Sequence, residues 1–231
     1  MLKNPFKALR KREWILWGIS LLLVLLSNLL CGQMDAVNLA ATSLGVTALI
    51  FIARGDVWGQ ILTVVFSILY GIVSFRFRYW GEMITYLGMT LPIAVMSIIT
   101  WLKNPYGKDV NEVRIARLGK GGTLMMWALT LAVTAVFYFI LRAFDTPNLL
   151  PSTFSVTTSF LACYLLMMRN SHYALAYAAN DVVLIILWVL ATLSDLSYLP
   201  MVVNFSMFLI NDLYGFISWK KREKKQGLKA A

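Results

Sequence analysis

The sequence has little charge. Asp, Glu, Lys and Arg make up only 14% of its 231 residues, whereas 59% are hydrophobic and the mean hydropathy is +0.71. Soluble domains are about a quarter charged, so this composition excludes an ordinary water-soluble fold. A hydrocarbon core about 30 Å thick is crossed by about 20 apolar helical residues. The chain is therefore predicted to be an all-α integral membrane protein with room for roughly eight spans.

Cysteine and histidine are also scarce. The two cysteines, Cys31 and Cys163, fall in different predicted helices, which argues against a disulfide framework. His172 is the only histidine, and the sequence has no H-E-x-x-H, G-x-S-x-G, P-loop or Cys/His metal spacing. We therefore expect no enzyme, metal or cofactor. A membrane enzyme that uses Asp181 and Asp212 as paired carboxyl groups stays open as the least favoured alternative.

Apolar runs separated by turn-forming residues predict eight transmembrane helices. The first run follows the basic start MLKNPFKALRKRE and lacks a small-residue cleavage pattern, so we expect it to be retained as a helix rather than removed as a signal peptide. The predicted spans are Trp14–Leu30, Ala36–Ala53, Val57–Phe75, Gly81–Trp101, Gly122–Arg142, Pro151–Met168, His172–Thr192 and Leu199–Trp219.

The net charge of +10 lies at the ends of these helices rather than on one face, which argues against nucleic-acid binding. With eight spans both termini share one side of the membrane. That side carries 18 of the 21 Lys and Arg residues, and the other side carries Arg76, Arg78 and Arg142. Lys and Arg accumulate in cytoplasmic loops, so both termini are expected in the cytoplasm.

The order of apolar spans suggests an internal repeat. Thr42–Trp58 resembles Thr157–Tyr173 at an offset of 115 residues, which pairs Arg54 with Arg169, and Trp101 pairs with Trp219 at an offset of 118. Three spans, one linking span and three spans give two parallel repeats, an arrangement that the SWEET sugar transporters share. The predicted organisation is an N-terminal tail and extra helix (1–31), a first repeat (36–103), a loop and linking helix (104–142), a second repeat (151–219) and a basic tail (220–231).

Polar residues recur on one face of several spans. Gln60 and Thr63 belong to a row in the third span spaced by three or four residues, which places them on one helix face. Asp181 is near the midplane of the seventh span, where a charge is costly and usually functional. The alternatives are a small-residue packing seam for the third span, and structural pairing for Asp181 and for Asp212. These lining groups suit a polar molecule with a flat ring.

The ending NDLYGFISW (Asn211–Trp219) resembles the N-x-x-Y-G-x-x-x-W ending of bacterial Pnu-type vitamin transporters, and the nicotinamide riboside carriers of the PnuC family are the nearest match. YALAYAAND (Tyr173–Asp181) resembles the aromatic-rich helix of that family, and WKKREKK resembles its basic tail. The resemblance covers the whole 3+1+3 core. Related carriers take riboflavin or thiamine, so those vitamins, and a SWEET-like sugar, stay open as substrates.

The resemblance implies uptake of nicotinamide riboside by facilitated diffusion across the bacterial inner membrane, with trapping by a cytoplasmic riboside kinase. It also implies a homotrimer embedded in the lipid bilayer. On this hypothesis Trp188 stacks on the pyridinium ring and Asn211 hydrogen-bonds the ribose or carboxamide. The full set of expected substrate-binding residues is Trp188, Asn211, Asn180, Asp181, Asn204, Asp212, Tyr177, Gln60, Thr63, Tyr86 and Thr90.

Overall fold

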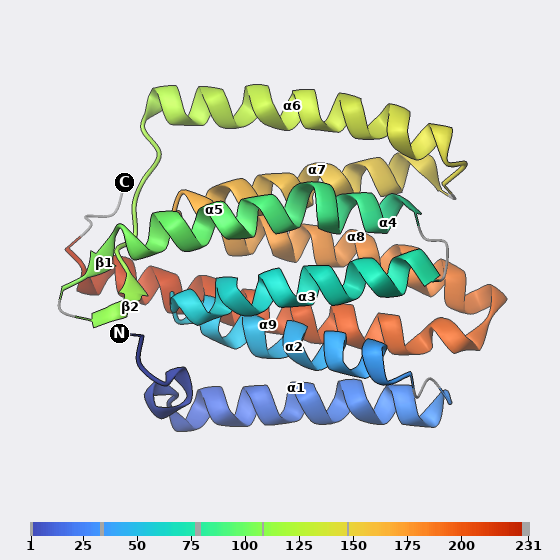
Figure 1. Ribbon diagram of the computed structural model, residues 1–231, viewed down its shortest axis with the longest axis horizontal. Coiled ribbons are helices and arrows are strands. Elements are labelled where there is room, and N and C mark those ends of the chain that lie inside the picture. The colour runs from blue at the N-terminus through green and yellow to red at the C-terminus, as the bar shows by residue number, and fades with distance from the viewer. Residues whose placement is uncertain (1, 33–34, 77–79, 108, 147, 228–231) are drawn as a thin grey trace.

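The computed structural model describes residues 2–32, 35–76, 80–107, 109–146 and 148–227, and long helices run side by side along one axis (Figure 1). Eight spans within the described residues are long and apolar enough to cross a membrane, which confirms the predicted class and number. They are α1 (Lys11–Leu30), α2 (Ala36–Ala53), α3 (Val57–Arg76), a composite span (Trp80–Leu102), α6 (Lys120–Ala143), α7 (Leu149–Met167), α8 (Tyr173–Ser194) and α9 (Leu199–Lys225).

The helix bounds follow the sequence closely, and α2 begins and ends at the predicted residues. The largest difference is at the end of α9, which continues to Lys225 instead of ending at Trp219. The prediction ended with the apolar run, but Lys, Arg and Glu are good helix formers. Basic side chains in a last turn also interact favourably with the helix dipole, so the helix extends into water.

The composite span is interrupted in its middle. It consists of α4 (Trp80–Thr85), a π-helical turn η2 (Tyr86–Thr90) and α5 (Leu91–Leu102). The turn closes through a bond from Leu91 N to Tyr86 O, just before Pro92. Proline has no N–H and its ring crowds the preceding turn, which accounts for the irregularity at this point. Single π-turns inside α-helices occur frequently at functional sites.

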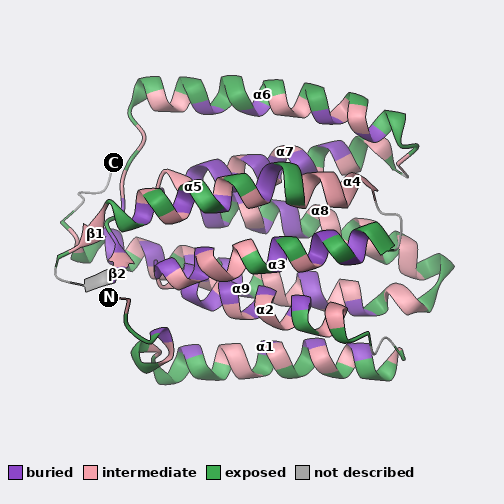
Figure 2. Ribbon diagram, viewed as in Figure 1, coloured by how far each residue is buried: buried purple, intermediate pink, exposed green. Residues whose placement is uncertain are grey.

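Six spans form a central bundle, and α1 and α6 lie on opposite sides of it (Figure 1). α1 packs against α2 and α9, whereas α6 packs mainly against α7 within the described residues. Buried residues gather in the bundle, and the outer faces of α1 and α6 are largely exposed (Figure 2). These faces are apolar, as Leu22 and Leu131 show with 63% and 67% exposure. Such surfaces are suited to lipid or to a protein partner.

Both chain ends lie at the same end of the bundle (Figure 1), which we call the terminal end. Here the loop after α5 forms a small hairpin of β1 (Pro105–Tyr106) and β2 (Asp109–Val113). Residues 111–116, which we call the strap, continue from it across the terminal end. Val113 N donates to Gly55 O and Ala116 N donates to Arg169 O, both at 2.9 Å. The strap therefore joins the ends of α2 and α7.

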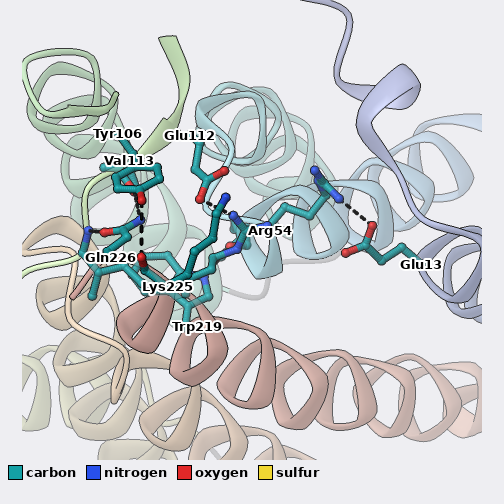
Figure 3. Close-up of polar contacts among 11 residues, drawn as sticks. Glu13, Arg54, Tyr106, Glu112, Val113, Trp219, Lys225 and Gln226 are labelled. Atoms are coloured by element: carbon teal, nitrogen blue, oxygen red, sulfur yellow. Dashed lines mark hydrogen bonds and ion pairs between the residues drawn. The ribbon is translucent and has the colours of Figure 1, made fainter. Parts of the chain in front are cut away.

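The side chains around the strap tie α9 to it (Figure 3). Gln226 accepts a hydrogen bond from Ile115 N at 2.8 Å and donates to Val113 O at 3.2 Å. Arg222 forms an ion pair with Glu112 at 2.5 Å. The loop predicted as a simple cytoplasmic connection is thus a folded cap on this end.

The turns that follow α2 and α7 have the same hydrogen bonds. Gly55 and Arg169 both have positive φ, at 66° and 60°, and each N–H bonds back into the helix it follows. Asp56 then accepts from Trp58 N, and Asn170 accepts from His172 N, both at 3.0 Å. These bonds pair Arg169 with Gly55, an offset of 114 residues, rather than with Arg54.

α1 is attached to its own bundle by polar groups. Glu13 Oε2 accepts from Arg54 at 2.6 Å (Figure 3), and Glu13 Oε1 accepts from Tyr214 at 3.0 Å. Further along α1, Trp17 Nε1 donates to Thr47 at 3.0 Å. A buried carboxylate is tolerated in a membrane protein when such donors surround it. The first helix is therefore an integral part of this chain's fold.

Candidate functional site

Three large aromatic side chains close the terminal end of the bundle. Trp101 and Trp219 are 1% and 0% exposed, and Tyr173 packs on the Trp219 ring with centroids 4.8 Å apart. Trp101 Nε1 donates to the α7 carbonyl of Leu166 at 3.1 Å, and Trp219 Nε1 donates to the α2 carbonyl of Ile52 at 2.8 Å. Each tryptophan is thus fixed by a directional bond to another helix.

A cavity of about 340 Å³ occupies the other half of the bundle. This volume is within the range of small-molecule sites. Its walls come from α4, η2, α7, α8, the beginning of α9 and the loops at the end opposite the termini. The lining residues are Trp80, Gly81, Glu82, Thr85, Tyr86, Leu141, Phe144, Thr146, Asn148, Ser152, Ser155, Val156, Ser159, Asn180, Leu184, Leu187, Trp188, Ala191, Tyr198 and Phe205.

One carboxylate and several aromatic rings face this cavity. Glu82 accepts a hydrogen bond from Tyr70 at 2.7 Å. The Tyr70 ring packs on Tyr86 with centroids 4.5 Å apart, so the acid is held beside an aromatic wall. On the α8 side, Trp188 packs on Tyr198 with centroids 5.6 Å apart. Among the described residues that line the cavity, Glu82 is the only Asp or Glu, and none is Lys, Arg or His.

Asn180 is held from one side only. Its Oδ1 accepts from Ser155 Oγ at 2.8 Å and from Thr158 Oγ1 at 3.1 Å. Both bonds use the amide oxygen, and the NH₂ group of an asparagine is a separate donor that takes no part in them. The serine and threonine of α7 therefore set the orientation of an amide that lies at the cavity wall.

A second polar group of side chains lies deeper, between the cavity and the closed end. The carboxyl groups of Asp181 and Asp212 interact with each other across the α8–α9 interface, and both are buried. Tyr177 OH lies 3.0 Å from Cys163 Sγ, which also interacts with Thr90. Among the described residues, no group of three His, Cys, Asp or Glu side chains is arranged to hold a metal ion.

The expected substrate-binding residues therefore fall into three groups. Trp188, Asn180 and Tyr86 line the cavity. Asp181, Asp212, Tyr177 and Thr90 belong to the deeper polar group. Asn211, Asn204, Gln60 and Thr63 do not line the cavity.

Asn211 has a clear structural partner. Its amide donates to Ser20 of α1 at 2.9 Å and to the backbone oxygen of Met207 at 2.8 Å. At Asn211, this face of α9 is thus turned toward α1. Phe205 and Asp212 follow Asn204 and Asn211 by one residue each and form a second row on α9. In this row Phe205 lines the cavity and Asp212 lies beside Asp181. The two rows have the same spacing of seven, so periodicity alone does not separate them.

Several polar side-chain atoms in the described part of the third span are buried without partners. Gln60 Nε2, Ser67 Oγ and Ser74 Oγ have no hydrogen-bond partner among the described residues, as is true of Asn204 Oδ1. Their spacing of seven residues puts the three α3 groups on one face. Thr63, by contrast, donates to Gly59 O at 2.9 Å. Unpaired groups at this depth are costly unless water or another polar group reaches them.

Sequence reasoning missed several cavity residues. Glu82 comes directly after Gly81, the predicted start of the fourth span, where sequence alone explains a carboxylate as a surface partner for a nearby arginine such as Arg76. In the structure Glu82 bonds Tyr70 instead. Ser155 and Ser159, four residues apart on α7, and Tyr198 also line the cavity. The four-residue spacing was a usable signal, whereas nothing local to Tyr198 distinguishes it from an interfacial tyrosine.

Three comparisons with known proteins agree on one family. The family model described as nicotinamide mononucleotide transporter matches residues 35–221. The nicotinamide riboside transporter PnuC of Neisseria mucosa is 25% identical over 186 residues, which cover 78% of this chain and 70% of the relative. The namesake of Haemophilus influenzae is 24% identical over 182 residues, with 78% and 77% covered.

A solved structure has the same fold. The crystal structure of the vitamin B3 transporter PnuC superposes with a TM-score of 0.79 and covers 95% of this chain and 94% of its own, at 21% identity. The relatives and this neighbour are all named as transporters. The resemblance found in the sequence is confirmed, and the paired-carboxyl enzyme is not supported.

Proposed function

This chain belongs to the nicotinamide mononucleotide transporter family, and on that premise we propose that it carries nicotinamide riboside across a bacterial membrane. The observation that carries the proposal is the charge of the cavity. Glu82 is its carboxylate, and no Lys, Arg or His is among the described residues that line it. Nicotinamide riboside has a cationic pyridinium ring, so the acid attracts it.

The same charge argues against the phosphorylated form of the substrate. A mononucleotide adds a phosphate of about −2 near neutral pH, which in proteins is usually met by Arg, Lys or a helix N-terminus. The described lining residues include the N-caps of α7 and α9, Asn148 and Tyr198, but no Arg or Lys, and the charged side chain among them is Glu82. A dianion would therefore lie close to Glu82 without a cationic side chain from this lining to balance it.

The proposed binding mode uses both halves of the cavity. The pyridinium ring lies against Trp188 or Tyr86, whose ring faces attract a cation, with Glu82 as its counter-ion. Asn180, held by Ser155 and Thr158, donates its amide hydrogen to the ribose or carboxamide oxygens. Asn211 does not enter this site, because it bonds to α1.

Calorimetric titration of the purified protein in detergent tests the substrate. We expect heat with nicotinamide riboside, and binding at least about tenfold weaker with the mononucleotide, since a hydrogen-bonded charge contributes about 1.5–3 kcal/mol. Riboflavin tests the neutral-ring alternative, and thiamine tests a different cationic ring. Equal or tighter binding of the mononucleotide would overturn the proposal. Binding of riboflavin or thiamine alone would mean that the protein is a transporter of the same fold for a different vitamin.

A matched pair of variants tests the role of Glu82. Glu82→Gln keeps the shape and should weaken riboside binding roughly tenfold or more. Asp145→Asn removes an exposed acid at the same end of the bundle that does not line the cavity. Its positive φ of 48° is tolerated by asparagine, so binding should be unchanged. If the two variants behave alike, Glu82 is not the counter-ion.

The transport mode that we propose is facilitated diffusion, followed by phosphorylation of the riboside by a cytoplasmic kinase. The 3+1+3 repeat supports passage between two similar bundles, and the matching turns after α2 and α7 support the repeat. Proteoliposomes should take up radiolabelled riboside without any ion gradient. Accumulation above the outside concentration in the absence of a kinase would contradict this mode.

Proton coupling is a second candidate, favoured by one observation. Asp181 and Asp212 are adjacent carboxyl groups at membrane depth, where such groups commonly carry protons. An imposed proton gradient would then accelerate riboside uptake, and Asp181→Asn would remove the acceleration. For uncoupled transport the initial rate is the same with and without the gradient.

Orientation and assembly complete the proposal. Both termini lie at one end of the bundle, and 18 of 21 basic residues were assigned to that side, so we place it in the cytoplasm of a bacterial inner membrane. Reporter proteins fused to the C-terminus test this orientation. The homotrimer implied by the family resemblance is tested by native mass spectrometry in detergent.

A further inference from the structure

A second, larger cavity lies at the terminal end, outside the transport path. It measures about 810 Å³ and is bounded by the first half of α6, the end of α7, the beginning of α8 and the end of α9. Its lining residues are Arg117, Leu118, Thr123, Met126, Trp127, Leu161, Leu165, Asn170, His172, Leu175, Ala176, Lys220, Glu223 and Lys224. The site proposed for the riboside shares none of these residues.

The cavity has a basic rim and an apolar wall. Arg117, Lys220 and Lys224 bring three positive charges to the rim, and Glu223 brings one negative charge. Glu223 is already neutralised, because it pairs with Lys220 at 3.0 Å and accepts from Ser171 at 2.7 Å. Arg117 and Lys224 are both exposed, so their charges are available to a ligand.

The wall continues the lipid-facing surface of the protein into the cavity. Trp127 and Leu175 are 50% and 42% exposed although both are large and apolar. Leu161 and Leu165 of α7 form the floor between them. A tryptophan beside basic residues at a helix end is typical of the membrane–water interface.

The first turn of α6 adds a third feature. Gly119 is its N-cap and provides no side-chain bond to the helix, so the first N–H groups of α6 are uncapped beside Thr123. Free N–H groups at a helix N-terminus favour phosphate. In Figure 1, α6 lies away from α7 at this end of the bundle and approaches it toward the other end.

We propose that this cavity binds an anionic phospholipid, with its phosphate at Arg117 and Lys224 and one acyl chain along Trp127, Leu161 and Leu175. Basic pockets between transmembrane helices are the usual sites for anionic headgroups. The lipid would fill the space between α6 and α7 and so fix the linking helix to the second bundle.

Native mass spectrometry with added phosphatidylglycerol or phosphatidylcholine tests the headgroup. Phosphatidylglycerol should remain bound at lower concentration than phosphatidylcholine. The double variant Arg117→Ala/Lys224→Ala should weaken its binding about 30-fold, since each cation near the surface contributes about fivefold. The control Arg114→Ala/Lys221→Ala removes the same charge from exposed residues outside the cavity and should leave binding unchanged. Equal binding of both lipids, or equal loss in both variants, would overturn the proposal.

Fluorescence locates the acyl chain. Phosphatidylglycerol with brominated chains should quench Trp127, and Trp127→Phe should lose that quenched component while the other tryptophans keep theirs. Glycerol 3-phosphate, which has the same charged group and no chain, should not displace the lipid at equal concentration. Displacement by glycerol 3-phosphate, unchanged quenching in Trp127→Phe, or cross-linking of Trp127 positions between two copies of the chain would each contradict a lipid in this cavity.

Discussion

The two ends of the bundle differ in how they are held. At the terminal end, buried tryptophans, the strap and Gln226 bond to backbone carbonyls and amides of α2, α7 and β2. At the opposite end, Trp188 packs on Tyr198, and both rings line a cavity. One end is fixed by directional bonds between helices, and the other is lined by rings and hydroxyl groups.

This difference indicates which end of the bundle is closed in the present conformation. Buried tryptophans hydrogen-bonded to another helix must lose both packing and a bond before the helices separate. At the opposite end, the packing of Trp188 on Tyr198 is a contact between rings beside the cavity. The structure is therefore closed at the terminal end, and the cavity proposed for the riboside lies on the other side of this closure.

The largest effect is expected at Trp219. Trp219→Ala removes a fully buried side chain and should lower the free energy of unfolding by about 3–5 kcal/mol, as large-to-small changes of this size do. Thermal unfolding in detergent measures the change. Trp219→Phe keeps an aromatic ring but loses the hydrogen bond to Ile52 O. That lost bond should lower the free energy of unfolding by about 1 kcal/mol, in addition to the loss from the smaller ring.

Trp127 is the control for this prediction. Its side chain is half exposed, so Trp127→Ala should shift the unfolding temperature much less than Trp219→Ala. Equal shifts in the two variants would mean that the closure at the terminal end is not what stabilises the bundle.

The next effect concerns the strap. Gln226→Ala removes two hydrogen bonds to the strap, from Ile115 N and to Val113 O, and should destabilise it locally by about 1–2 kcal/mol. Hydrogen exchange of the strap amides should then accelerate, while exchange in the middle of α3 stays as before. Lys221→Ala, at an exposed position on the same helix, should change neither. Uniform acceleration would indicate global rather than local opening.

Most of the fold was predictable because apolar length and breaker residues determine spans directly. Ala36–Ala53 was placed to the residue, since Asp35 caps its start and Gly55 ends it. The strap was not predictable, because its bonds join backbone groups whose neighbours in space are far apart in sequence. The π-turn at Tyr86–Thr90 was signalled only by Pro92, which also occurs at ordinary helix starts.

The site was predictable only in part. Trp188, Asn180 and Tyr86 were expected from polar and aromatic helix faces, and all three line the cavity. Asn211 was chosen by the same rule, yet its partner is Ser20 of α1. Sequence shows which residues share a helix face, but not which neighbouring helix that face meets. Which row of α9 faces the cavity, that of Asn211 or that of Phe205, becomes clear only once the position of α1 is known.

A smaller effect is expected at the end opposite the termini. Ser155→Ala removes one of the two bonds that orient Asn180 and should weaken riboside binding about fivefold, the value of one net hydrogen bond of about 1 kcal/mol. Unfolding temperature should change little, because Thr158 still holds the amide. Ser206→Ala removes a similar hydroxyl, bonded to Val202 O away from the cavity, and should leave binding unchanged. Equal affinities in the two variants would remove Asn180 from the proposed site.

The smallest effect is a pH dependence at the terminal end. Burial lowers the pKa of His172, and Lys220 and Arg117 lower it further, whereas Glu223 opposes them. A folded-state pKa below the unfolded value of 6.5 means that the unfolded chain binds the proton more readily. Stability should therefore be complete above about pH 6.5 and decrease as the pH falls below it. The decrease should be small, because the ring is exposed and its charge is screened.

Unfolding temperatures of the wild type and of His172→Gln, recorded between pH 7.5 and pH 5.5, measure the contribution of His172 to stability. His172→Gln carries no titrating ring, so the gap in stability between wild type and this variant should narrow or reverse toward acid pH. Lys220→Met removes the cation that lowers the pKa of His172 most and should make the wild-type decrease shallower. A gap that widens as the pH falls would mean that the imidazolium is stabilised rather than opposed here, with Glu223 outweighing burial and the two cations.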